Sequence, residues 1–174
     1  MNSGLTQVVV NLTAPVTYGP NQNAETVLMS YLFPKDILEP GALVRVSAKG
    51  IMTTVAGQPV MDLRLRLGPV TLVGVQVAKW TVFTSNNQTD KTWTLDADMT
   101  VQAGGVTAWG QGAVATSVNT QFQFGWVGSD QAAAVAFDNT IDNLVELTAD
   151  WDDLAANILK MTNATLTVLS PVPS

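Results

Sequence analysis

Carboxylates are the side chains of this chain best suited to chemistry, because the sequence contains no histidine and no cysteine. A Ser-His-Asp triad, a Cys-His dyad and a zinc site built on these residues are therefore excluded. Asp96 and Asp98 alternate with apolar residues, which predicts that both lie on the outer face of one strand. Two carboxylates on one face could in principle serve as the acid and the base or nucleophile of a glycosidase.

A pair of arginines has the same spacing. Arg64 and Arg66 alternate with leucines in the segment Met61–Leu67, so they share the outer face of another predicted strand. Charged residues normally occupy the solvated face of a sheet, where opposite charges pair. We therefore interpret Arg64, Arg66, Asp96 and Asp98 as partners in cross-strand or inter-subunit ion pairs. A carbohydrate-active enzyme that uses Asp96 and Asp98 is the third and least favoured function. If the two faces meet across a subunit contact, the arginines would supply bidentate hydrogen bonds.

Neither a metal nor a cofactor is predicted. Asp150, Asp152 and Asp153 offer oxygen atoms that could bind calcium, but they lack EF-hand spacing and are interpreted as a solvated acidic loop with at most one helical turn. The glycine-rich segment 104–112 lacks the Gly-Lys-Ser/Thr ending of a phosphate-binding loop. Its Trp-Gly-Gln-Gly string predicts a bulge or bend in a long strand.

Five tryptophans are a second group of candidate binding residues. Trp93, Trp126 and Trp151 fall on apolar faces of predicted strands and are expected in the core. Trp80 and Trp109 lie in or beside predicted loops, so they are the candidates for a surface role such as stacking on a sugar.

Charge and hydropathy argue against two classes of partner, nucleic acids and membranes. The formal net charge is −6, and the eight Lys and Arg residues form no run, which argues against a nucleic-acid partner. No segment approaches the ~18 consecutive apolar residues of a membrane span, and the first residues lack the pattern of a signal peptide. We therefore expect a protein made in a cytoplasm, with no membrane partner.

The length of 174 residues fits one domain. Period-two alternation interrupted by Gly, Pro and Asn predicts an all-β fold, a single antiparallel β-sandwich of jelly-roll type with roughly eight to ten strands. The predicted division is an N-terminal arm or first strand at 1–23, a jelly-roll domain at 24–170 and a short tail at 171–174. The strand segments are expected at 25–33, 43–49, 61–67, 73–77, 81–84, 93–101, 114–127, 134–137, 144–151 and 164–169.

Several segments resemble tailed-phage virion proteins. The stretch Thr26–Leu38 with Pro40–Val46 is similar to a strand of the type T-x-L-x-S-Y-x-[IF]-P that leads through a short loop and a glycine turn into the next strand. Asp62–Gly68, Thr140–Trp151 and Asn157–Leu169 resemble later strands of the same proteins. Lys35 and Asp36 replace the usual Ala-Asn after the proline.

The resemblance implies a jelly roll of the tumour-necrosis-factor type, often trimeric, in a head decoration, fibre or tail component. It carries over no functional residues, because the shared pattern builds the fold. We expect a non-enzymatic virion protein, a homotrimer that binds the major capsid protein and is assembled in the host cytoplasm. The segment Met1–Asn23 would tie it to a neighbour. The alternative is a tail or fibre component that recognises a host glycan through Trp80, Trp109 and the 104–112 loop.

Overall fold

A computed structural model of the chain describes residues 6–55, 58–102, 106–118, 122–126 and 134–169. Within these residues every regular element is a strand, and twelve strands are present, more than the sequence predicted. They are β1 (Thr6–Asn11), β2 (Val16–Tyr18), β3 (Thr26–Phe33), β4 (Leu43–Thr54), β5 (Val60–Gly68), β6 (Val75–Phe83), β7 (Gln88–Val101), β8 (Thr107–Thr116), β9 (Phe122–Trp126), β10 (Val135–Ala136), β11 (Asn143–Trp151) and β12 (Ile158–Leu169).

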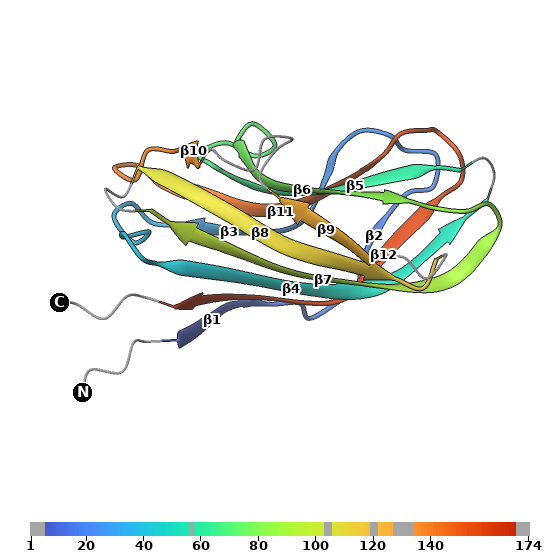
Figure 1. Cartoon of the computed structure of the whole chain (residues 1–174), viewed down its shortest axis with the longest axis horizontal. Helices are drawn as coiled ribbons and strands as arrows, with labels where there is room; N and C mark the ends of the chain where they lie inside the picture. Colours follow the sequence, from blue (N-terminus) through green and yellow to red (C-terminus); the bar gives the residue numbers. More distant parts are fainter. Residues whose placement is uncertain (1–5, 56–57, 103–105, 119–121, 127–133, 170–174) are drawn as a thin grey trace.

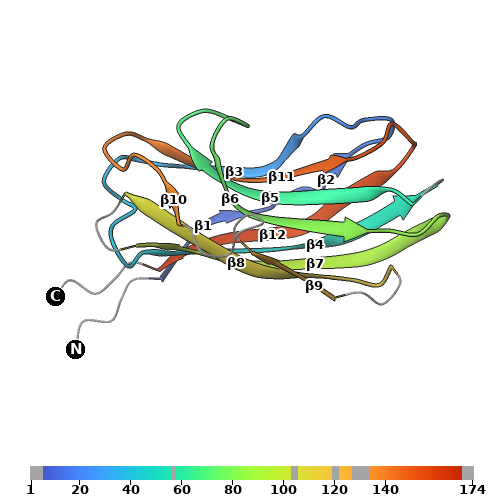
Figure 2. The same cartoon turned by 45° about the horizontal axis from the view of Figure 1, so that its top comes forward.

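The strands form two antiparallel layers that face each other (Figures 1 and 2). One layer has the order β1-β12-β4-β7-β8-β9, and the other has the order β6-β5-β11-β3. Strand β9 joins the layers on one side, since it pairs with β8 and also with β6 through Lys79 and Trp126. On the other side the layers end in two separate edge strands, β1 and β3.

The chain path confirms the predicted jelly-roll sandwich. The connections β3–β4, β4–β5, β6–β7 and β11–β12 each pass from one layer to the other, so sequential strands face one another across the core. Strand β1 pairs with β12 from Thr6 opposite Leu169, which places the first and last described residues side by side.

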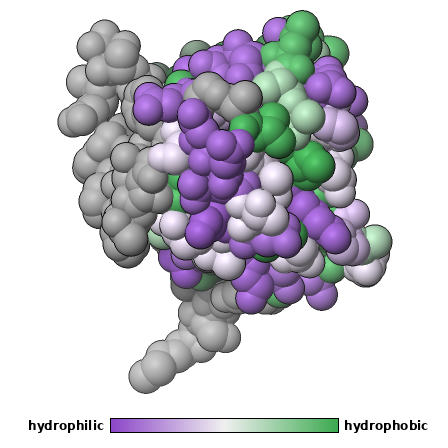
Figure 3. All heavy atoms as spheres, turned by 90° about the vertical axis from the view of Figure 1, so that its right-hand side faces the viewer, coloured by the Kyte–Doolittle hydropathy of each residue, from purple (hydrophilic) through white to green (hydrophobic). Residues whose placement is uncertain are grey.

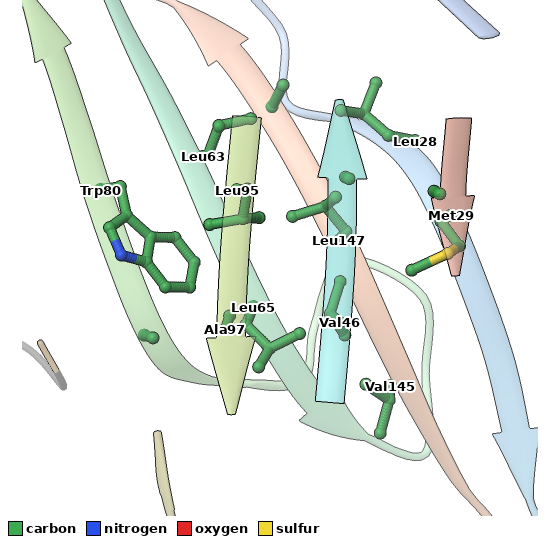
Figure 4. Packing of buried hydrophobic residues seen from close by; sticks show 14 of the residues in the cluster. Leu28, Met29, Val46, Leu63, Leu65, Trp80, Leu95, Ala97, Val145 and Leu147 are labelled. Carbon is green, nitrogen blue, oxygen red and sulfur yellow. The ribbon is translucent and has the colours of Figure 1, made fainter. Parts of the chain in front are cut away.

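The core lies between the layers and consists of the inward residues of the alternating strands. Figure 4 shows Val46, Leu95 and Ala97 from one layer pointing toward Leu63, Leu65, Trp80 and Leu147 from the other. Met61, Leu63, Leu65 and Leu67 are all fully buried, as the alternation in that segment predicted. Burial of this continuous apolar surface is the main source of stability for a domain without disulfides.

Three local predictions were wrong. The segments 73–77 and 81–84 are one strand, β6, because a register shift opposite Leu65 and Arg66 interrupts its alternation. The segment 114–127 contains the end of β8 and, after a break, β9. The acidic segment after Trp151 forms bends and no helical turn.

The described part of the predicted N-terminal arm belongs to the sandwich. Strands β1 and β2 both pair with β12 of the same chain. Val9, Val10 and Val16 pack against the core, and the Tyr18 side chain is 1% exposed. Residues 6–23 are therefore not a free arm, since their strands pair within the sandwich and most of their apolar side chains pack against its core, although Val8 is 58% exposed.

Candidate functional site

The structure places the two predicted charged pairs on opposite outer faces of the sandwich. Arg64 and Arg66 belong to β5, in the β6-β5-β11-β3 layer, whereas Asp96 and Asp98 belong to β7, in the other layer. The core therefore separates the arginines from the aspartates. The two pairs do not form one site within this chain.

Arg64 and Arg66 are the centre of a cluster that we call the charge network. It consists of three carboxylates and three cations: Glu25, Asp62, Asp150, Arg64, Arg66 and Lys79. Arg66 binds Glu25 in a bidentate manner, at 2.6 Å from Nε and 2.7 Å from Nη2. Arg64 bridges Asp150, at 2.5 Å, and Asp62, at 2.7 Å.

Solvent reaches the charge network poorly, so its ionisation is coupled to folding. Burial alone would raise the pKa of Glu25, but hydrogen bonds from Arg66 and Thr148 and the charges of both arginines hold that pKa below its ordinary value. Burial raises the pKa of Asp150 despite the opposing hydrogen bond and charge of Arg64. The network is electroneutral and internally satisfied, which is the arrangement of a structural clamp joining the start of β3 to β5 and β11.

Asp96 and Asp98 also have partners within the chain. Arg45 donates to both carboxylate oxygens of Asp98, at 2.8 and 3.2 Å, and the Ser47 hydroxyl donates to Asp96 at 2.6 Å. The Arg45 and Asp98 side chains are 53% and 29% exposed, so this pair is solvated. The predicted cross-strand ion pairing is present, with Arg45 in place of Arg64 or Arg66.

The division of the tryptophans between core and surface differs from the prediction. Trp80 is 1% exposed and lies on β6 in the core, so the surface role predicted for it is wrong. Trp93 and Trp151 are buried, as expected. Trp109 is half-buried on the outer face of β8, opposite Thr100. The side chain of Trp126 falls outside the described residues.

The glycine-rich segment is strand from Thr107 onward, and Val106 before it is a bend. Ala108–Thr116 pairs with β7 without a register shift, so the predicted bulge is absent there. A Cβ atom at Gly110 would lie 2.8 Å from Val77 Cγ1 and 2.9 Å from the Val77 carbonyl oxygen. The glycine is therefore required because β6 crosses close to β8. The segment 103–105 lies outside the described residues.

A groove opens on the side where the two layers end in β1 and β3. Its volume is about 270 Å³, and we call it the edge groove. Neither edge strand contains a charged residue or a proline. Tyr31 and Phe33 meet edge to face in it, with ring centroids 4.8 Å apart. The lining residues are Gln7, Val9, Tyr31, Phe33, Pro34, Ile37 and Val168.

The connection between β5 and β6 is held rigidly against the sheet. We call Val70–Gly74 the apolar loop. The Leu72 N–H donates to Glu146 Oε2 at 2.9 Å, and Glu146 is 1% exposed. Leu72 has a left-handed backbone, with φ 61°, which costs a non-glycine residue about 1–2 kcal/mol. A Cβ at Gly74 would lie 2.7 Å from the Leu67 carbonyl carbon, so only glycine permits this close return.

The apolar loop nevertheless presents its side chains outward. Val70, Leu72 and Val73 are 54%, 36% and 74% exposed. At the opposite end of the sandwich, hydrophilic and neutral residues make up most of the described surface (Figure 3). Among the described loops of that end, which follow β2, β4, β6 and β11, Leu154 is the one exposed large hydrophobic residue. The surface is therefore asymmetric, with apolar side chains gathered toward one end.

The described residues contain no group of three His, Cys, Asp or Glu side chains that could hold a metal ion. Asp152 and Asp153 instead accept hydrogen bonds from Val60 N and Ala155 N, which fixes the loops around them. No helix in the described ranges is long and apolar enough to cross a membrane.

No known protein family matches this chain, and no curated protein matches it. Three solved structures match over 99% of the chain: the CBM2 module of the evolved Dit of Lactobacillus casei BL23 phage J-1, the carbohydrate recognition domain of Emp47p, and infectious bursal disease virus, Gx strain. Their sequence identities are 12%, 10% and 9%, and their TM-scores are 0.39, 0.42 and 0.31. The match covers 100%, 90% and 42% of those chains. These likenesses are too distant to bear on function.

Proposed function

We propose that this chain is a non-enzymatic structural protein of a virus particle. In the specific form of the proposal, it is a capsid decoration protein that binds the major capsid protein and stabilises the shell as a homotrimer of tumour-necrosis-factor-like jelly rolls. The supporting observation is the chain path. The segments that resemble tailed-phage virion proteins are β3, β4, β5, β11 and β12, and they lie side by side as β5-β11-β3 and β12-β4.

The state of the polar side chains supports a binding role over a catalytic one. Asp98 is paired with Arg45, and Asp96 accepts a hydrogen bond from Ser47. A general acid or base must instead be available to a substrate proton. The exposed apolar side chains and the uncharged edge strands are features of a surface that meets another protein.

Particles assembled without this chain test the proposal. They should take up the purified protein, and their shells should release the genome at a lower temperature until the protein is restored. Heat resistance that does not change when the chain is removed or restored would contradict a stabilising role.

A tail or fibre component that binds a host glycan is the second candidate, and Trp109 supports it. Its half-buried ring lies on an outer face near the exposed Gln111, two residues along the same strand. Aromatic rings with neighbouring amides are suited to sugars. Trp109→Ala should abolish binding on a glycan array under this function and leave capsid uptake unchanged under the first.

A further inference from the structure

We propose that the apolar loop of one copy of this chain inserts into the edge groove of a second copy. The inference deepens the proposed function and rests on it for the homotrimer, because it names the surfaces through which the copies would associate. Both surfaces are apolar, both are accessible, and they belong to different parts of the fold.

The apolar loop has the properties of a preorganised anchor. Apolar side chains that are mobile lose conformational entropy when they bind, whereas a rigid loop avoids most of that cost. Here the buried Glu146 carboxylate holds Leu72 N, and Arg66 donates to the Gly74 carbonyl at 2.9 Å. The left-handed Leu72 is maintained by these contacts although its own side chain remains partly exposed. The fold thus fixes a backbone that leaves Val70 and Val73 more than half exposed.

The edge groove is the matching receptor. Its volume of about 270 Å³ is enough to take apolar side chains of valine or leucine size, and its walls are Val9, Tyr31, Phe33 and Ile37. The apolar loop carries no charge, and the residues that line the groove include no charged side chain; their polar groups are the Gln7 amide and the Tyr31 hydroxyl. Insertion therefore buries no unpaired charge, although the whole chain carries a net charge of −6.

The positions of the two surfaces define the kind of assembly. The loop connects β5 to β6, while the groove lies between β1 and β3, at the end of the β6-β5-β11-β3 layer away from β6. A contact between two different surfaces is heterologous, so an open assembly of any length keeps one free loop at one end and one free groove at the other until a ring closes. Closure after three copies gives the trimer of the proposed function.

The test compares three substitutions of exposed apolar residues by aspartate. Val73→Asp charges the loop, Ile37→Asp charges the groove, and Leu154→Asp is a matched control at the opposite end of the sandwich; these side chains are 74%, 49% and 62% exposed. Analytical ultracentrifugation of the purified chain, without particles, should find a trimer for the unmodified protein and for Leu154→Asp. Each of the other variants should associate at least about tenfold more weakly.

Mixing the two defective variants gives the decisive result. Val73→Asp keeps an intact groove and Ile37→Asp keeps an intact loop, so the mixture should form a one-to-one heterodimer at concentrations where each variant alone stays monomeric. An unmodified chain that stays monomeric, equal weakening by Leu154→Asp, or a mixture without heterodimer would overturn the inference. If circular dichroism finds either variant unfolded, Val70→Asp and Val9→Asp replace them in the same comparison.

This experiment separates the inference from the proposed function. A monomeric chain that still binds capsid shells would overturn the loop-and-groove contact and leave the decoration role standing. A chain that forms the ring but is absent from particles would have the opposite consequence.

Discussion

The substitution Glu25→Gln should destabilise the fold by an amount set by the burial of the charge network. Breaking a fully buried ion pair costs about 3–5 kcal/mol, and breaking an exposed one costs about 0–1 kcal/mol. The Glu25 and Arg66 side chains are 21% and 17% exposed, so the pair lies between these limits. We therefore expect a loss of about 2 kcal/mol at pH 7, or a melting temperature lower by about 4–8 °C for a domain of this size.

The effect should depend on pH with a definite sign. The pKa of Glu25 is lower in the folded protein than its ordinary value. Its stabilisation is therefore complete above the unfolded pKa of about 4.3 and is lost as the pH falls through the lower folded value. The difference in the free energy of unfolding between the unmodified protein and Glu25→Gln should shrink over that acidic range.

Urea denaturation followed by tryptophan fluorescence measures this difference, because Trp80, Trp93 and Trp151 are buried and report on unfolding. Asp98→Asn is the matched control, since the Arg45–Asp98 pair is solvated and should contribute less than about 1 kcal/mol. Equal losses for Glu25→Gln and Asp98→Asn at pH 7, or a Glu25→Gln loss that persists unchanged at acidic pH, would refute the assignment.

Four further predictions concern single features. Asp150→Asn should cost little at neutral pH in urea denaturation, because burial raises the pKa of Asp150, so that its charged form gains no stability from folding; a loss as large as that of Glu25→Gln would contradict this. Leu65→Ala should lower the free energy of unfolding by about 2–5 kcal/mol, since Leu65 is completely buried, and a loss below about 1 kcal/mol would place it outside the core. Gly110→Val should reduce the melting temperature strongly because its side chain would collide with Val77, whereas an unchanged melting temperature would exclude that contact. Deletion of residues 1–23 should produce a poorly folded protein by circular dichroism, because it removes the buried Tyr18 and exposes the core residues that β2 covers. A stable truncated domain would instead support a separate arm.

The sequence contained enough information for the fold class and for the inward faces of its regular strands. In Met61–Leu67 and Trp93–Val101 the alternation is uninterrupted, and the predicted inward residues are buried. The position predicted for Trp80 was wrong, since this residue is buried in the core. A register shift in β6 places Val77 and Ala78 both in the core, so the period-two pattern breaks and the strand resembles two short pieces beside a loop.

The contacts of the candidate sites could not be predicted in the same way. Arg66 pairs with Glu25, which is far from it in the sequence and precedes β3, an edge strand that β11 separates from β5. Alternation places Glu146 on an outer face, but only the return of the apolar loop buries it. The edge groove is likewise a product of strand order, because β1 and β3 become neighbouring edges only after both layers have formed.

The copy number of this chain in purified virus particles, relative to the major capsid protein, tests the central claim most directly. Quantitative mass spectrometry of such particles measures it. The decoration role predicts hundreds of copies in a fixed ratio to the capsid subunit. A few copies or tens per particle would contradict that role and support the tail or fibre alternative, and complete absence from particles would contradict both.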